Sequence, residues 1–175
     1  AQAEHDVNSK CILITNDNNF AIQVKKEIKL PVSNLAKKEI INKSLSTFGA
    51  IVILKNLKKA ADIINLIAPE HVHLQIKNVD KIFKKLINVG AVFLGKYSTE
   101  AFGDYIAGTN HILPTSGTAK FSSGLGVLDF MKRSSYVYMD KENYLELANK
   151  VADMATIEHL EGHKLSVTIR QKDKK

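Results

Sequence analysis

Short apolar segments alternate with amphipathic helical patterns along the first half of the chain, and this alternation constrains the fold more than any other feature. Four strands are expected, at CILIT (11–15), AIVILK (50–55), HLQI (73–76) and AVFLG (91–95). The stretches between them repeat apolar residues with the period of an α-helix. Strands and helices that alternate with short connections form parallel βαβ units, with helices on both faces of the sheet. We therefore predict an α/β fold, an incomplete Rossmann-like parallel sheet with flanking helices.

Polar residues at capping positions indicate where these helices begin. The sequence NDNN follows the first strand, Ser33 or Asn34 precedes the second helical pattern, and Asn56 and Asn78 precede the third and fourth. Pro31 is expected to interrupt the chain between the first two helices. The glycine-rich fingerprint GxGxxG does not occur, so a conventional dinucleotide site is not expected.

The pattern changes in the last quarter of the chain. An alternating strand is predicted at SSYVYMD (134–140), and Asp140 is predicted to cap a long helix. Gly162 is the residue at which this helix is expected to stop or bend, and the helix could resume in KLSVTIR. One strand and one long helix in about 45 residues cannot bury a core of their own. We predict two domains, 1–129 and 130–175, the second being a strand–helix dimerisation arm that packs on the main domain or on a partner subunit.

Composition excludes several classes of protein. No run of about 18 apolar residues exists, so no membrane span is expected. The N-terminal residues lack the layout of a signal peptide, and Cys11 is the single cysteine, which fits a reducing, cytoplasmic environment. AQAEH has the character of a helix end, so we expect either that the protein was cut or that the chain begins inside a larger fold.

The net charge of +7 raises the possibility of nucleic-acid binding. However, the lysines come as scattered pairs, and aromatic residues make up only 7% of the chain. Nucleic-acid binders gather charge on one face and often interleave aromatic side chains. We therefore expect solvated helix faces and no nucleic-acid partner. The pairs are Lys37–Lys38, Lys58–Lys59 and Lys84–Lys85.

One polar loop, residues 103–124, is the first candidate for a functional site. Its sequence, GDYIAGTNHILPTSGTAKFSSG, favours neither a helix nor a strand, and it contains Asp104 and His111. Ordering a loop costs roughly 1–2 kcal/mol per residue in backbone entropy. Long ordered loops in compact domains are therefore usually functional.

Three further polar clusters could contribute chemistry. A single histidine is more often an ordinary surface or core residue than a ligand, so none of the clusters is specific alone. Histidine is nevertheless the natural general base near neutral pH, and a desolvated glutamate can join it. Nitrogen and oxygen donors of these types suit zinc, although spacing alone does not establish a metal site. The clusters are Gln2 with His5, Glu70 with His71, and Glu158, His159, Glu161 and His163 of IEHLEGH.

Several motifs together resemble one known family. QAEH, APEH, GAVFLG, GDYIAGTNHILPTSGTAKFSSGLGVLDFMKR and HLEGHKLSVTIR are similar, in this order, to the C-terminal part of histidinol dehydrogenase. The resemblance implies an NAD-dependent zinc enzyme of histidine biosynthesis, which oxidises L-histidinol to L-histidine through the aldehyde with two NAD⁺ and one Zn²⁺. The family's first portion, with most of its NAD contacts, has no counterpart in this chain.

The resemblance also implies roles for individual residues. The zinc ligands would be Gln2, His5, Asp104 and His163, and the zinc would orient substrate by binding its amino and imidazole nitrogens. His71 would take the proton of the substrate hydroxyl, and Glu70 would activate water for the second oxidation. The substrate-binding set implied by the resemblance is Gln2, His5, His71, Asp104, His111, Glu158 and His163.

The resemblance further implies a homodimer in which the C-terminal arm crosses to the partner subunit. Glu158 and His163 would then complete the neighbouring site, in agreement with the small core expected for the arm. Two functions stay open at this point. The chain is either the C-terminal part of a working enzyme, inactive alone, or a truncated, catalytically inactive zinc-binding dimeric remnant.

Overall fold

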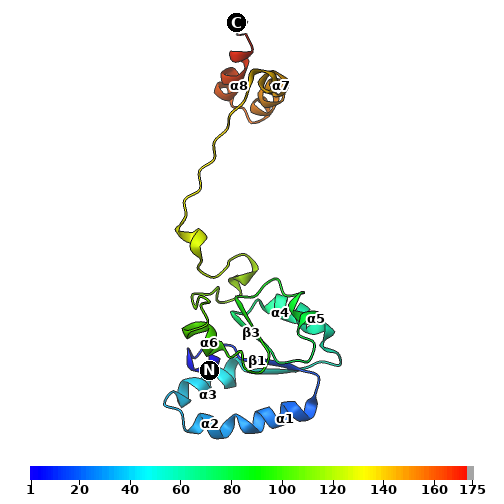
Figure 1. Ribbon diagram of the computed structural model, residues 1–175, viewed down its shortest axis with the longest axis vertical. Helices are drawn as coiled ribbons and strands as arrows, with labels where there is room; N and C mark the ends of the chain where they lie inside the picture. The colour runs from blue at the N-terminus through cyan, green and yellow to red at the C-terminus, as the bar shows by residue number, and fades with distance from the viewer. Residues whose placement is uncertain (173–175) are drawn as a thin grey trace. The chain divides into compact units, whose positions relative to one another are not determined.

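The computed structural model describes residues 1–172, which divide into two compact units (Figure 1). The first unit is Ala1–Phe130 and the second is Met131–Lys175. The first contains all the strands of the described chain, and the second is helical. Within the described residues, no helix is long and apolar enough to cross a membrane.

Four short strands in the first unit form two parallel pairs. Strand β1 (Ile12–Thr15) pairs with β2 (Ala50–Ile53), and β3 (His71–Leu74) pairs with β4 (Ala91–Leu94). All four strands lie near their predicted positions, and each pair is parallel as predicted. The expected single sheet is not formed, because no ladder joins one pair to the other within residues 1–172. The Rossmann-like character of the layer stays a prediction.

Strand β3 begins two residues earlier than the sequence pattern indicates. The Gly90 amide donates to the carbonyl of Pro69 at 3.0 Å, and the Ala91 amide donates to that of Glu70 at 2.7 Å. These bonds extend the pairing of β3 with β4 to residues that precede the apolar segment 73–76. A Cβ atom on Gly90 would lie 2.4 Å from the Glu70 carbonyl oxygen, so only glycine fits this approach.

Side-chain caps fix the starts of two helical segments of the first unit. Asp17 accepts a hydrogen bond from the Phe20 amide at 3.0 Å, and Asn56 accepts one from the Lys58 amide at 2.8 Å. The Asn56 cap was predicted. The helices of this unit are α1 (Asn18–Glu27), α2 (Lys29–Ser33), α3 (Lys38–Phe48), α4 (Ala60–Ile67), α5 (Asp80–Phe83) and α6 (Glu100–Tyr105), with short 3₁₀ turns η1 (Gln2–Glu4), η2 (Leu57–Lys59), η3 (Thr118–Lys120) and η4 (Val127–Phe130).

The predicted caps Ser33 or Asn34 and Asn78 are wrong. Pro31 lies inside the first turn of α2, where the backbone N–H that proline lacks would have no partner within the helix. The helix therefore continues through Pro31, and Ser33 and Asn34 lie at its end rather than at the start of α3. Helix α5 starts at Asp80 without a side-chain cap, and Asn78 contributes its carbonyl oxygen to the Lys81 amide at 3.3 Å.

The core of the first unit lies between α4, α5 and β3. Ile14 of β1 and Val92 of β4 pack against it, so both strand pairs reach this core. Burying an aliphatic side chain of this size contributes about 1.5–3 kcal/mol each. The buried members are Ala60, Ala61, Ile64, Val72, Leu74 and Ile82.

Asn65 of α4 holds the connection between α5 and β4 by its side chain. Its amide group donates to the Lys85 carbonyl at 2.8 Å, and its oxygen accepts from the amides of Ile87 at 2.9 Å and Asn88 at 3.2 Å. These three bonds satisfy backbone groups that lie outside any helix or strand. They fix the chain just before β4 pairs with β3.

The second unit contains helices α7 (Lys141–Ile157) and α8 (Glu161–Thr168) and the turn η5 (Arg170–Lys172). The predicted cap is confirmed, since Asp140 accepts from the Asn143 amide at 2.9 Å. The predicted strand at 134–140 is wrong. These residues form no regular structure, and no strand among the described residues pairs with them.

Helix α7 ends before the predicted stop. The Leu160 amide donates to the Ala155 carbonyl at 2.8 Å and the His159 amide to that of Thr156 at 3.1 Å, while His159 takes a φ of 57°. This is the left-handed helix ending usually built on glycine. Gly162 instead lies inside α8. The two helices pack through small residues of α7, namely Ala148, Ala152 and Ala155.

Candidate active site

Two polar side chains come from the first turn of the chain. Gln2 begins η1 and His5 follows its last residue, while Ala3 between them is buried. The imidazole of His5 is exposed, and its Nδ1 lies 3.2 Å from the carbonyl oxygen of Gln2. Buried Ala3 thus anchors a short helical turn from which Gln2 and His5 project.

His71 meets Gln2 at the start of β3. The His71 Nδ1 and the Gln2 Oε1 lie 3.0 Å apart, although the residues are 69 positions apart in the sequence. The His71 side chain is only 12% exposed, and its Nε2 is buried without a hydrogen-bond partner among the described residues. A buried nitrogen of this kind is costly unless a ligand or substrate pairs with it.

Helix α6 brings two carboxylates to the same ring. Glu100 and Asp104 are four residues apart and therefore share one face of the helix. The Glu100 Oε1 lies 3.7 Å from the His71 Nδ1, and the Asp104 Oδ1 lies 3.9 Å from its Nε2. The imidazole thus has one acidic group near each of its nitrogens.

Close packing sets the position of α6. A Cβ atom on Gly103 would lie 2.5 Å from a ring carbon of Phe93, so glycine allows the helix to approach the strand β4. The Phe93 ring in turn lies 5.9 Å from that of His71, centroid to centroid. The Phe93 ring therefore contacts both the helix that carries the two carboxylates and the imidazole of His71.

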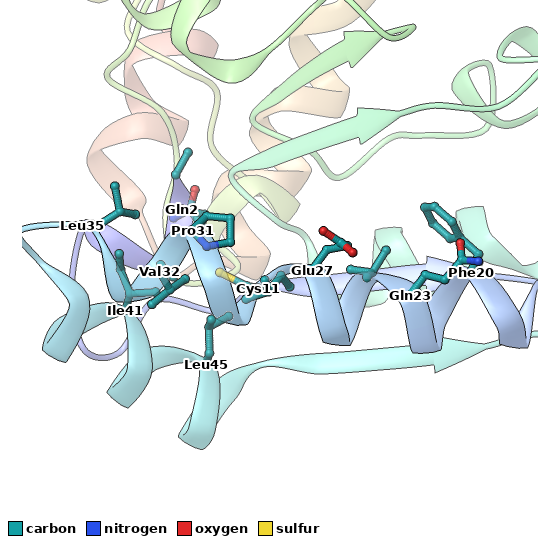
Figure 2. Close-up of a pocket in the computed structure, with 14 residues that line it drawn as sticks. Gln2, Cys11, Phe20, Gln23, Glu27, Pro31, Val32, Leu35, Ile41 and Leu45 are labelled. Carbon is teal, nitrogen blue, oxygen red and sulfur yellow. The ribbon is translucent and has the colours of Figure 1, made fainter.

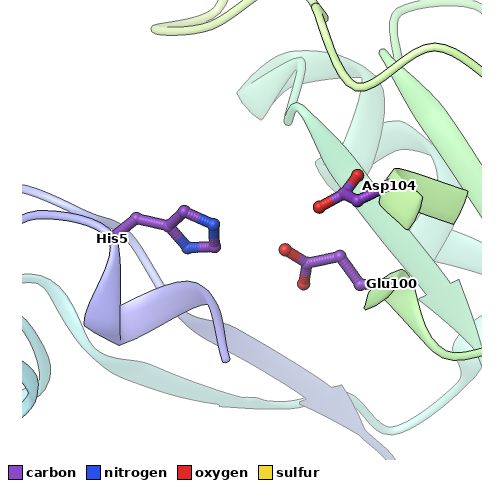
Figure 3. Close-up of side chains that lie close together, drawn as sticks. All are labelled: His5, Glu100 and Asp104. Atoms are coloured by element: carbon purple, nitrogen blue, oxygen red, sulfur yellow. The ribbon is translucent and has the colours of Figure 1, made fainter. Parts of the chain in front are cut away.

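His5, Glu100 and Asp104 form a group that fits a metal ion. Their nearest nitrogen and oxygen atoms all lie within 4.8 Å of one another, and the three side chains point toward a common space (Figure 3). One imidazole and two carboxylates are donors that zinc accepts. Gln2, also predicted as a ligand, directs its amide oxygen to His71 in this structure.

Glu100 is the member of this group that sequence reasoning missed. The loop predicted from the sequence starts at Gly103, whereas Glu100–Tyr105 form a helix. The available signal was the four-residue spacing of Glu100 and Asp104, which places two carboxylates on one helical face. The loop prediction is therefore wrong up to Tyr105.

Glu70 and His111 are not joined to the cluster by any recorded side-chain bond within residues 1–172. Glu70 is half-buried directly before β3, and its carbonyl oxygen belongs to the ladder. His111 is exposed in the loop after α6. Its neighbour Asn110 orders that loop by donating to the Leu125 carbonyl at 2.7 Å and accepting from the Ile112 amide at 2.8 Å.

Glu158 and His163 belong to the second unit. Glu158 is the residue at which α7 ends, and His163 lies exposed in the first half of α8. The His163 carbonyl accepts from the Ser166 hydroxyl at 2.7 Å. Their roles as substrate contact and zinc ligand stay predictions.

A pocket of about 530 Å³ opens beside η1 (Figure 2). Gln2 is at its edge, so the pocket and the polar cluster share one residue. Cys11 also lines it, and burial raises the pKa of the Cys11 thiol, while the nearby N-terminal charge acts in the opposite direction. Most of the lining is apolar, and includes Phe20, Val24, Ile28, Pro31, Val32, Leu35, Ile41 and Leu45.

Comparisons with known proteins give one consistent result. The family model for histidinol dehydrogenase matches residues 1–171. The histidinol dehydrogenase of Caldanaerobacter subterraneus subsp. tengcongensis is 48% identical over 170 residues, which are 97% of this chain and 40% of that protein. That of Aquifex aeolicus is 43% identical over 173 residues, 99% of this chain and 41% of that protein.

A solved structure agrees with the sequence comparison. The crystal structure of histidinol dehydrogenase from Elizabethkingia anophelis matches with a TM-score of 0.85 at 35% identity, over 97% of this chain and 39% of that one. The chain spans about 40% of the length of the curated relatives it matches. The resemblance carried by the sequence motifs is confirmed, and the chain belongs to the histidinol dehydrogenase family.

Proposed function

We propose that this chain is the C-terminal catalytic part of a cytoplasmic histidinol dehydrogenase, which oxidises L-histidinol to L-histidine through the aldehyde in histidine biosynthesis. The observation that supports this most is the convergence of Gln2, His5, His71, Glu100 and Asp104 from three distant segments. A base, whose Nε2 has no hydrogen-bond partner among the described residues, and a set of metal-ligating donors then surround one space. Family membership supplies the reaction that such a space would serve.

His71 acts as the base for the substrate hydroxyl in this proposal. Its Nε2 is buried without a hydrogen-bond partner among the described residues, so a hydroxyl would satisfy it. The O–H bond of the alcohol breaks, its proton moves to Nε2, and its electron pair forms the carbonyl as hydride leaves the carbon. NAD, when bound, supplies the acceptor for that hydride. We assign no residue of this chain to NAD.

Glu70 activates water for the second oxidation. It directly precedes His71, its side chain is half-buried, and a carboxylate is one of the side chains that serve as general bases. The water oxygen adds to the aldehyde carbon while its proton moves to Glu70. The resulting hydrate anion would give the carboxylic acid by transferring a second hydride to a second NAD⁺, when bound.

The polar group at η1 and α6 orients the substrate. His5, Asp104 and Glu100 are the donors that fit zinc, with Gln2 and His163 as the remaining predicted ligands. Zinc, when bound, would hold nitrogen atoms of the substrate and keep its alcohol beside the base. His111 and Glu158 are proposed to contact substrate.

The active form is proposed to be a homodimer that includes the portion of the family absent from this chain. Glu158 and His163 would reach the site of the partner subunit, so each site would need both protomers. Among the described residues of the second unit, the buried apolar side chains are three alanines, which supports packing against another surface.

The test is reconstitution of activity. The chain is mixed or co-expressed with the preceding portion of the Aquifex aeolicus relative, and NADH formation from L-histidinol is followed. We expect activity in the mixture and none from the chain alone. In the mixture, His71→Asn should lower kcat by about 10²- to 10⁴-fold, the usual contribution of a general base.

His73→Asn is the matched control, because His73 lies on the same strand but is exposed and contacts the Gly95 carbonyl at 2.7 Å. Its activity should stay within about twofold of wild type, in the range of other surface changes. Equal losses in the two variants would refute the assignment of the base to His71.

Arm exchange has a separate test. A mixed dimer of His71→Asn and His163→Ala chains should regain one functional site, because one site then holds both native residues. Inactivity of the mixed dimer would mean that the arm serves its own protomer.

The alternative function is a truncated, catalytically inactive dimer that binds zinc. The group His5, Glu100 and Asp104, whose donors fit a metal ion, supports this alternative. Zinc binding by calorimetry, with no NADH from any reconstituted mixture, would identify the remnant. Turnover in the mixture would exclude it.

A further inference from the structure

The strands β3 and β4 have one face toward the core and the other toward the candidate site. Val72 is buried in the core, and Val92 packs against it. Because side chains alternate along a strand, His71 and Phe93 lie on the opposite face. Their rings are 5.9 Å apart, centroid to centroid, with a tilt of 38°, which is an ordinary geometry for a pair of aromatic rings. Phe93 therefore stands beside the proposed base on a strand that the core holds in place.

Helix α6 has few means of its own to fix its position. It is six residues long, and Thr99 precedes it without a side-chain capping bond among the described residues. Helices as short as this are not stable alone in water. Of the six residues of α6, all of which the structure describes, only Gly103 is buried. The place of α6 on the first unit therefore depends on what surrounds Gly103.

The ring of Phe93 is the closest neighbour of Gly103. A Cβ atom on Gly103 would lie 2.5 Å and 2.9 Å from two carbons of that ring. The Thr109 hydroxyl also donates to the Gly103 carbonyl at 2.8 Å. Since Thr109 follows α6 in the sequence by a few residues, this bond joins the next loop to the helix and does not join the helix to a strand. The spacing between α6 and β4 is therefore set at the contact with Phe93.

This spacing matters because Gly103 lies between the two carboxylates of α6. Glu100 and Asp104 approach the nitrogens of His71 to 3.7 Å and 3.9 Å, and both belong with His5 to the group whose donor atoms lie within 4.8 Å of one another. Both carboxylates move with the helix. Donor distances in a metal site are fixed to within about 0.2 Å, so even a small displacement of α6 would disturb such a site.

We propose that Phe93 is a positioning residue for the candidate site. Its ring contacts the His71 imidazole and the backbone of α6 at Gly103, sets the distance between them, and so determines how well the carboxylates of α6 can bind zinc. The part of this statement that concerns zinc rests on the proposed function. The part that concerns the position of α6 does not, because it describes the protein without metal or substrate.

The first experiment exchanges size between the two contacting residues. In Gly103→Ala the added methyl group would collide with the ring, and in Phe93→Leu the outer ring carbons are lost and leave a space. The double variant places the methyl group in that space. Residual dipolar couplings of the full chain, measured by NMR without metal, report the orientation of α6 relative to β3 and β4. We expect a changed orientation in each single variant and a return toward the wild-type orientation in the double variant.

The second experiment is zinc titration of the same chains by calorimetry. Gly103→Ala should raise the zinc Kd by about 10- to 100-fold, the usual effect of losing a group that holds metal ligands in place. The double variant should bind zinc more tightly than Gly103→Ala. Val92→Ala is the matched control, because Val92 is the neighbour of Phe93 on β4 but packs against the core. It should lower the melting temperature and leave the zinc Kd unchanged.

An unchanged orientation of α6 in both single variants would overturn the proposal, and so would a double variant displaced as far as Gly103→Ala. A zinc Kd that follows the melting temperature through every variant, Val92→Ala included, would also overturn it, since Phe93 would then serve stability alone. Phe93→Leu and the double variant decide the question even if Gly103→Ala fails to fold. A wild-type chain that binds no zinc refutes the zinc site of the proposed function, and the dipolar couplings then decide the role of Phe93.

Discussion

The two units of this chain are specified in different ways. The first unit has a core shared by α4, α5, β3 and β4, and its polar cluster joins residues up to 102 positions apart, from Gln2 to Asp104. The second buries three alanines, and its helices start and end with local signals, the Asp140 cap and the His159 turn. Contacts between residues distant in the sequence therefore determine the structure of the first unit. In the second unit, residues close together in the sequence determine where the helices start and end.

The largest effect is expected for a core substitution in the first unit. Ile64 is 7% exposed and packs in the core, so Ile64→Ala should lower the free energy of unfolding by about 2–5 kcal/mol. Leu165→Ala, at a 62% exposed position of α8, should change it by about 0.5 kcal/mol or less. Urea denaturation followed by circular dichroism measures both values. A loss at Leu165 comparable to that at Ile64 would mean that α8 is covered in the assembled protein.

A pair of glycine substitutions sharpens the comparison. Gly90→Ala would place a Cβ atom 2.4 Å from the Glu70 carbonyl oxygen, and we expect it to cost about 1–3 kcal/mol of stability. In α8, Gly162 has no heavy atom within 4 Å of such a Cβ atom. Gly162→Ala should therefore stabilise the helix by about 0.5–1 kcal/mol. Thermal melts of both variants measure the two changes, and effects of the same sign would contradict the contrast.

The same contrast explains what the sequence could predict. The Asn56 and Asp140 caps and the four strand positions follow from neighbouring residues, and the structure agrees. The missed features depend on distant residues. The Tyr136–Tyr138 segment alternates like a strand but has no partner strand among the described residues, and Glu100 becomes part of a cluster only when α6 packs on Phe93.

The end of α7 at His159 is a local feature that the amino-acid sequence does not indicate. Its φ of 57° is a conformation that glycine adopts readily and that costs other residues about 1–2 kcal/mol. We expect His159→Gly to raise the stability of the second unit by about 1 kcal/mol. His159→Ala serves as the control, since it removes the imidazole but keeps the cost, and should give no gain. Helicity at 222 nm during thermal unfolding distinguishes the two.

The smallest effect is expected at the start of α7, and it depends on pH. The Asn143 amide donates to the Asp140 carboxylate and holds the pKa of that group below its ordinary value of 3.8. A pKa lowered in the folded state means that the carboxylate stabilises the helix above that ordinary value and loses this contribution as the pH falls through the folded pKa. Asp140→Ala should therefore be less stable than wild type near neutral pH, and the difference should shrink below pH 3.8.

Asp140→Asn separates the cap from the charge. Asparagine caps helices about as well as aspartate but does not titrate, so its difference from Asp140→Ala should persist across the whole pH range. Thermal melts of wild type and both variants, between about pH 6 and pH 2, give the three curves. A wild-type advantage over Asp140→Ala that stays constant to the acid limit would show that a group other than the Asp140 carboxylate stabilises α7. Because Asp140 is fully exposed and its bond is made to a residue only three positions away, the expected change is confined to the second unit.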